Sequence, residues 1–131
     1  MAPAESTREI SRAEWNEFFD GFSRRHRGWL ATVEEVGPTT GAMVESRMLP
    51  FEGIFADSGE EGSVTLLLGR EPDKHVEHSI AAPKRVWLET LEGGAEAALE
   101  IESGAGRKTI LSFEHPRPSE MVDGLVRTDL V

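Results

Sequence analysis

The sequence predicts a mainly β domain, of α+β type, in which an N-terminal amphipathic helix packs on an antiparallel sheet. Three observations predict this fold class. One stretch near the N-terminus has helical periodicity, and apolar residues alternate with polar ones through most of the chain after it. Clusters of Gly, Pro and Asp separate the alternating runs at short intervals. Sequential strands with short connections favour a meander of about seven strands, curled or closed as a small barrel.

The length of 131 residues predicts a single domain. The N-terminus lacks the basic and apolar regions of a signal peptide, and no apolar run reaches the roughly 18 residues of a membrane span. We therefore expect a cytoplasmic protein with no membrane partner. The predicted parts are a loose N-terminal segment at 1–9, a helix at 10–28, a β-sheet or barrel at 29–113 and a C-terminal tail at 114–131.

The composition is strongly acidic. Asp and Glu number 24 against 14 Lys and Arg, which gives a net charge of -10, and there is no cysteine. A chain of this charge is repelled by nucleic acid, so we expect no nucleic-acid partner. The absence of cysteine excludes disulfides and thiolate metal sites, and it fits a reducing compartment.

The helix has a recognisable start. Ser11 and Glu14 form an S-x-x-E capping box, with Ile10 and Trp15 placed as a hydrophobic staple. Basic residues suit the C-terminal end of the helix, and Gly28 can cap it. Aromatic residues then recur at i, i+3, i+4 and i+7 and predict one buried stripe: Trp15, Phe18, Phe19 and Phe22.

Alternating runs after Gly28 predict the strands. Pro50 interrupts one of these runs and indicates an edge or a bend. Val64, Leu66 and Leu68 form an apolar face with Leu67 on the other side, which predicts a central strand covered on both faces. The predicted strands are 29–36, 42–49, 51–56, 64–68, 74–80 and 84–91, followed by a hairpin at 97–113.

The register of the hairpin at 97–113 follows from parity. Leu99 and Ile101 alternate with glutamates, and a Gly-Ala-Gly turn then leads into the second strand. A three-residue loop pairs Ser103 with Arg107, whereas a loop one residue shorter or longer sets apolar residues against the wrong face. The pairs expected are Ile101 with Thr109, Leu99 with Leu111, Ala97 with Phe113, and Glu102 with Lys108.

The basic run Arg24, Arg25, His26 and Arg27 is the most concentrated positive patch of the chain. It could contact an anion or a phosphate backbone. It could equally place cations at a helix C-terminus and pair with the abundant acids, which stabilises the fold. We favour this second interpretation and keep the four residues as candidate binding residues.

His75 and His78 are the second candidate site. Three positions apart on a strand, they point to opposite faces and cannot chelate one ion together. Glu77 shares a face with His75, but a catalytic zinc site needs about three protein ligands. We therefore expect no metal and no cofactor, and we interpret one histidine as a surface residue and the other as hydrogen-bonded near the core.

Trp87 shares a face with Leu91 and is the third candidate. We favour a core position for it beneath the helix. If the helix does not cover that face, Trp87 becomes part of a ligand or partner patch. No nucleophile motif of the G-x-S-x-G type is present, and paired glutamates such as Glu34 and Glu35 are typical of solvated faces. No catalytic residue is therefore predicted.

Several segments together resemble a known family. They are Thr7-Arg8-Glu9-Ile10, the helix rich in Trp and Phe, Phe22-Ser23-Arg24-Arg25-His26-Arg27-Gly28-Trp29, Leu99-Glu100-Ile101-Glu102-Ser103 and Met121-Val122-Asp123-Gly124. Across residues 7–125 the chain resembles a family of small bacterial proteins classed as a domain of unknown function. The resemblance implies a bacterial, intracellular, single-domain protein, and it implies no activity and no site residues.

These observations leave three functional hypotheses open. The leading one is a non-enzymatic binding or protein-interaction module, with self-association through an exposed strand edge as one form of it. The alternative is a small-molecule-binding barrel that uses the histidines as polar anchors at its mouth. An enzyme is the third and least favoured.

Overall fold

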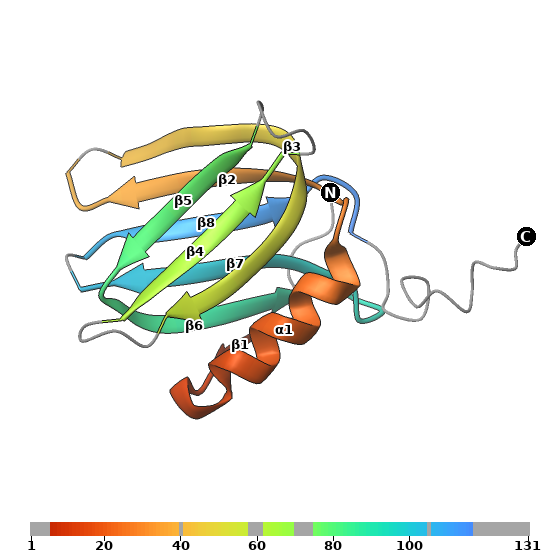
Figure 1. The fold of residues 1–131 in the computed structure, drawn as a ribbon, viewed down its shortest axis with the longest axis horizontal. Helices are drawn as coiled ribbons and strands as arrows, with labels where there is room; N and C mark the ends of the chain where they lie inside the picture. The colour runs from red at the N-terminus through yellow and green to blue at the C-terminus, as the bar shows by residue number, and fades with distance from the viewer. Residues whose placement is uncertain (1–5, 40, 58–61, 70–74, 105, 117–131) are drawn as a thin grey trace, which may run out of the picture.

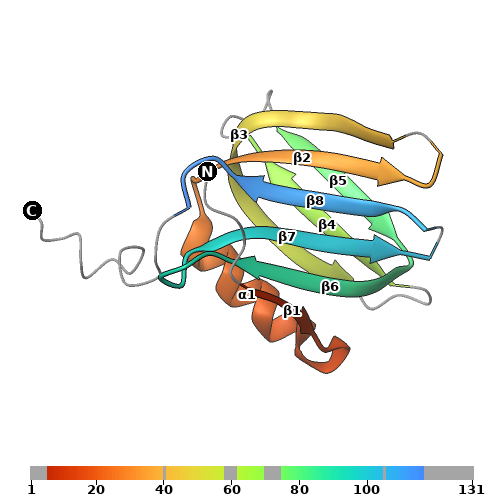
Figure 2. The same ribbon diagram turned by 180° about the vertical axis from the view of Figure 1, so that it is seen from behind.

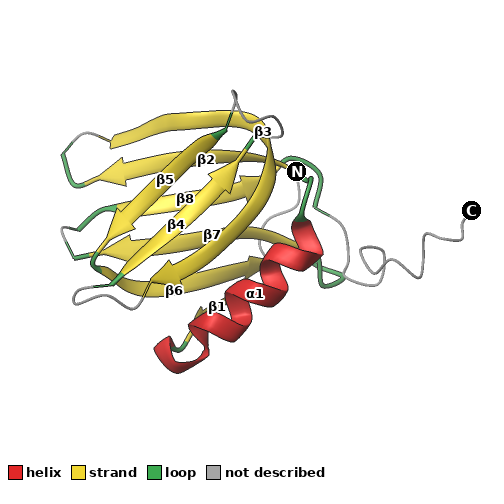
Figure 3. Cartoon of the chain, in the orientation of Figure 1, coloured by secondary structure: helices red, strands yellow, loops and turns green. Residues whose placement is uncertain are grey.

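The computed structural model describes residues 6–39, 41–57, 62–69, 75–104 and 106–116. In this part of the chain, eight strands and one α-helix form the fold (Figures 1 and 3). The strands are β1 (Ser6–Ile10), β2 (Leu30–Gly37), β3 (Gly41–Asp57), β4 (Ser63–Leu68), β5 (Val76–Ala81), β6 (Pro83–Thr90), β7 (Glu96–Ser103) and β8 (Lys108–Phe113); a 3₁₀ turn, η1 (Arg12–Glu14), precedes the helix α1 (Trp15–His26).

All neighbouring strands are antiparallel, in the order β1-β6-β7-β8-β2-β3-β4-β5. The mainly β prediction with an N-terminal helix is therefore confirmed. The predicted barrel is not confirmed, because β1 and β5 are the two edges of an open sheet. The order also departs from a simple meander, since β2 lies between β8 and β3 and the first strand pairs with the sixth.

The long strand β3 belongs to two layers. Its first part pairs with β2 as far as Pro50, and from Phe51 onward it pairs with β4. Shortly before this change of partner, Met48 adopts a positive φ of 56°, and the register with β2 is interrupted there by a bulge. Figure 1 shows β3 curving out of the first layer, so that β4 and β5 cross over β8 and β7. Two strands predicted at 42–49 and 51–56 are thus one strand, and Pro50 is found at the predicted bend.

The core lies between these two layers. Alternate residues of the strands point into it, and those of β4 (Val64, Leu66 and Leu68) are fully buried, whereas Leu67 on the other face is only half-buried. β4 is paired on both edges, as predicted for a central strand. Burial of each such side chain stabilises the fold by about 1.5–3 kcal/mol. Other core residues of the strands include Phe51, Val86, Leu99, Ile101, Leu111 and Phe113.

Helix α1 closes one end of the space between the layers by packing on β3. The Ser23 hydroxyl accepts a hydrogen bond from the Ile54 N–H (2.9 Å) and donates one to the Ile54 carbonyl (3.1 Å). One side chain therefore satisfies both backbone groups of a residue on the unpaired edge of β3. The Gly28 N–H, just after the helix, donates to the Phe51 carbonyl at 2.7 Å and continues this cover.

The start of the chain differs from the prediction. Residues 6–10, expected to be loose or at the helix start, form β1 and pair with β6. Only Ile10 of this strand is buried, so its sequence lacks the alternation that predicts a strand. The helix begins at Trp15 after η1, and the Ser11 side chain forms no capping hydrogen bond. The Trp15 indole donates instead to the Ile10 carbonyl at 2.9 Å.

The hairpin prediction is confirmed in register. Glu102 lies opposite Lys108, Ile101 opposite Thr109 and Leu99 opposite Leu111, and the Ser103 N–H donates to the Arg107 carbonyl at 2.8 Å. The ladder runs to the Ala98–Ser112 pair, so the predicted Ala97–Phe113 pair lies just beyond it. Most of the predicted tail, from residue 117 onward, lies outside the described residues.

Candidate functional site

A cavity of about 450 Å³ opens at the end of the two layers away from α1. It forms because β5 follows β4 across the second layer while the first part of β3 stays with β2, so β3 and β5 diverge. The inner face of β2 and β8 forms its back wall. The lining residues are Val33, Glu35, Glu45, Glu77, His78, Ser79, Ile80, Ala81, Ser103, Arg107 and Thr109.

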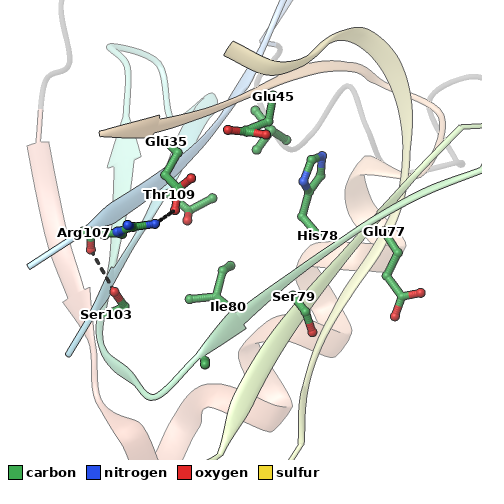
Figure 4. A pocket seen from close by; sticks show the side chains of 11 residues that line it. Glu35, Glu45, Glu77, His78, Ser79, Ile80, Ser103, Arg107 and Thr109 are labelled. Carbon is green, nitrogen blue, oxygen red and sulfur yellow. Dashed lines mark hydrogen bonds and ion pairs between the residues drawn. The ribbon is translucent and has the colours of Figure 1, made fainter. Parts of the chain in front are cut away.

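The floor of this cavity is apolar and its rim is polar. Val33 and Ile80 are buried core residues, and Thr109 beside them is also buried. Besides Glu77, the rim carries the carboxylates of Glu35 and Glu45, the imidazole of His78 and the guanidinium of Arg107. Figure 4 shows His78 and Ile80 pointing toward the centre of the site, whereas Glu77 points away from it. This alternation is that of the strand β5.

The His78 side chain is held by a hydrogen bond to a residue of β3. Its Nε2 lies 2.7 Å from the Ser46 hydroxyl, which is 7 % exposed and belongs to β3. This hydrogen bond links the two diverging strands and fixes the imidazole ring. In the described part of the chain, Nδ1 has no protein partner. It is therefore available to donate to or accept from a ligand, according to the tautomer.

The two carboxylates differ in their partners. Glu35 on β2 is 3.4 Å from the Arg107 guanidinium, and both side chains are partly exposed. Glu45 stands at an extra residue of β3, between the pairs that β2 forms with Val44 and Ser46. Among the residues placed by the structure, Glu45 forms no ion pair. The inward-pointing charges of the rim therefore sum to a negative value.

The basic run of α1 does not reach this cavity. Arg24 pairs with Asp20, one turn earlier in the helix. Arg25 donates to Glu96 on β7 at 2.9 and 3.2 Å, and Arg27 donates to the Glu52 carbonyl at 3.3 Å. Each guanidinium thus has a partner within the chain, an arrangement that agrees with the stabilising interpretation of the run.

His26, the fourth residue of that run, is 2 % exposed. Its ring lies nearly parallel to that of Phe113, with centroids 4.8 Å apart. Its Nδ1 is 2.8 Å from the Phe22 carbonyl and its Nε2 is 3.2 Å from the Glu96 carboxylate. Both ring nitrogens therefore face oxygen acceptors inside the fold, and His26 is not available to an external ligand.

Glu96 is the residue of this cluster that the sequence did not indicate. Burial works against its ionisation, but hydrogen bonds from His26 and Arg25, together with their charges, outweigh that effect and hold its pKa below the ordinary value. Glu96 lies about 70 positions after Arg25, and nothing in the local pattern links the two.

His75 is exposed just before β5, apart from the cavity that His78 enters. In the described ranges, no three His, Asp or Glu side chains are placed to hold a metal ion. Trp87 is half-buried on the outer face of the sheet, opposite Glu9 and Glu100, and not beneath the helix as we favoured. The cause is the register of β6, whose inward residues are Val86 and Leu88.

The chain matches a known protein family over most of its length. This family, DUF5335, is described as a family of unknown function, and its model matches residues 6–122. No curated protein and no solved structure matches the chain. Among the described residues, no helix has the length and apolar composition needed to cross a bilayer.

Proposed function

This chain belongs to the DUF5335 family of unknown function, and we propose that it is a non-enzymatic binding protein for a small polar molecule. The ligand site is the cavity between β3 and β5. Its volume of about 450 Å³ falls within the roughly 300–1,000 Å³ of small-molecule sites. Most of its lining is polar above an apolar floor, which favours a polar ligand over an apolar one.

The charges of the rim favour a ligand that carries an amine. Arg107 is already held by Glu35, whereas Glu45 has no ion pair within the described chain. An ammonium group between the two carboxylates would compensate their charge, and the Nδ1 of His78 would contact a polar atom of the same ligand. The net charge of -10 attracts such cations from a distance.

Catalysis is the less favoured use of the same residues. A serine hydroxyl 2.7 Å from a histidine nitrogen is part of the arrangement that activates a nucleophile. Ser46, however, is 7 % exposed and does not line the cavity. Its hydroxyl is therefore placed to orient His78 and not to attack a bound molecule.

The free edge of β3 at residues 41–48 is poorly suited to pairing with a strand of another chain. Residues 41–48 of β3 have no strand partner on one side within the described chain. The register with β2 is interrupted there twice, near Glu45 and near Met48. Bulges of this kind twist an edge and hinder its pairing with another chain. This geometry does not favour self-association through residues 41–48. Self-association through β1 or β5, the two edge strands of the sheet, stays a prediction.

A ligand panel tests the proposed function. We expect small amines such as putrescine and ethanolamine to raise the melting temperature by several degrees at roughly 0.15 M salt, with succinate as the negative probe. Glu45→Gln and His78→Asn should each weaken the binding measured by calorimetry by about tenfold. Glu114→Gln, at an exposed position away from the cavity, is the charge-matched control for Glu45→Gln.

The proposed function would be wrong if no amine shifted the melting temperature. It would also be wrong if Glu45→Gln and Glu114→Gln weakened binding equally, because that result indicates attraction to the overall charge and not to the cavity.

A further inference from the structure

The outer face of the first layer is open, a feature separate from the cavity. Figure 2 shows β6, β7, β8 and β2 side by side, with no other described element in front of them. The register places one residue from each of six strands in a single row across this face. In order, the row is Glu9, Trp87, Glu100, Ile110, Glu34 and Val44. Acidic and apolar side chains therefore alternate along it.

Trp87 is the central feature of this row. Glu9 on β1 and Glu100 on β7 lie directly opposite it, which places both Cβ atoms about 4.5–5.5 Å from its own. An indole between two carboxylates is a favourable position for a cation, which the ring face and the charges attract together. Trp15 shows this preference within the chain, since the Arg12 guanidinium lies 4.4 Å from its ring centroid.

No cation of the described chain occupies the corresponding position at Trp87. Glu100 is 3.8 Å from Lys108, but Glu9 and Glu34 form no ion pair within the described ranges. The row therefore combines a half-buried aromatic ring with acids that the fold itself does not neutralise. Ile110 and Val44 add apolar surface, and Val44 is 41 % exposed.

We propose that this row is a docking surface for a lysine- or arginine-rich segment of a partner protein. A basic side chain would lie over Trp87 between Glu9 and Glu100, and a second would reach Glu34. Charge decides between the occupants: a second copy of this chain has a net charge of -10 and is repelled, as is nucleic acid. A basic segment has the complementary charge and makes its apolar contacts with Ile110 and Val44.

A fluorescein-labelled octalysine peptide, followed by fluorescence anisotropy at low and at physiological salt, is the probe. We expect Trp87→Val to weaken its binding by about threefold. The double variant Glu9→Gln/Glu34→Gln should weaken it by about fivefold. The control is Glu92→Gln/Glu114→Gln, which removes the same charge at two exposed positions away from the row and should retain more of the affinity.

An indole NMR spectrum supplies a readout that overall charge does not affect. Trp87→Val assigns one of the three indole signals, and that signal should move most when the peptide is added. Equal losses in the two double variants, or an unperturbed Trp87 signal, would overturn the proposal. So would a peptide that does not bind, or a concentration-dependent dimer that Trp87→Val abolishes, which would show that the occupant is a second copy.

Discussion

Glu96 joins the sheet to the end of the helix through the side chains of Arg25 and His26. It accepts hydrogen bonds from Arg25, lies 3.2 Å from His26, and is 18 % exposed. In Glu96→Gln one carboxylate oxygen becomes an NH2 group, so a donor of Arg25 or His26 then faces another donor and lacks an acceptor. Unsatisfied groups of this kind cost about 1–3 kcal/mol of stability.

The lowered pKa of Glu96 makes that contribution depend on pH. The folded pKa lies below the ordinary value of 4.5, so the stabilisation is fully present above about pH 4.5 and is lost as the pH falls through the folded pKa. We expect Glu96→Gln to lower the free energy of unfolding near neutral pH by about 1–3 kcal/mol. The deficit should shrink on acidification in urea denaturation series.

Glu92→Gln is the matched control, because Glu92 is exposed a few positions before Glu96. It should change stability by less than about 0.5 kcal/mol at every pH. A deficit of Glu96→Gln that stays constant down to strongly acidic pH would contradict the proposed linkage.

One residue of the aromatic stripe of α1 is less buried than the others: Trp15, Phe19 and Phe22 are buried, and Phe18 is not. Phe22 is fully buried, with ring centroids of Phe51 and Phe113 at 5.8 and 5.7 Å. Phe18 is only partly buried, although the helical periodicity predicts equal burial for both residues. The difference arises because Phe18 lies at the margin of the stripe, beside the exposed residues Glu14 and Glu17.

The two phenylalanines should therefore respond differently to truncation. We expect Phe22→Ala to lower the free energy of unfolding by about 3–5 kcal/mol. Phe18→Ala should cost about 1–2 kcal/mol, because less apolar area is lost from the core. Urea denaturation of both variants measures the difference, and equal losses would show that the helix docks in another orientation.

Sequence patterns predicted some elements well and others not at all. The hairpin of β7 and β8 was predictable because its two strands are adjacent and parity leaves one loop length that keeps Leu99 and Leu111 on the same face. β1 was not, because its partner lies about 80 positions later and only Ile10 is buried. Long-range pairing, and not local propensity, decides the structure of such a segment.

A single residue, Ala82, connects β5 in one layer of the molecule to β6 in the other. Ala82 has a positive φ of 52° there, in a region that costs residues other than glycine roughly 1 kcal/mol. We expect Ala82→Gly to raise the free energy of unfolding by up to about 1 kcal/mol. Ala56→Gly, near the end of β3 where Ala56 pairs with Val64, should lower it by about 0.5–1 kcal/mol.

Denaturant midpoints with unchanged m-values measure both effects. A loss of stability in Ala82→Gly as large as that in Ala56→Gly would show that the corner carries no backbone strain.

The sequence indicated single candidate residues but not the cavity that brings them together. His78 and Trp87 stood out by residue type, and the alternation along β5 and β6 correctly separated their neighbours into two faces. The cavity itself depends on the divergence of β3 and β5, which arises because β3 pairs first with β2 and then with β4. Ser46 and Arg107 reach the site only through that three-dimensional arrangement, so no local pattern indicated them.

The pairing of β1 with β6 has a consequence for folding during synthesis on the ribosome. Ser6 lies opposite Thr90, so β1 cannot complete its pairing with β6 until the chain has been synthesised as far as Thr90. Until then Trp15, Phe19 and Phe22, which are buried in the finished fold, lack much of the surface that covers them. While the residues from 23 to 90 are synthesised, this aromatic segment therefore stays incompletely covered, and chaperones would bind it during that interval.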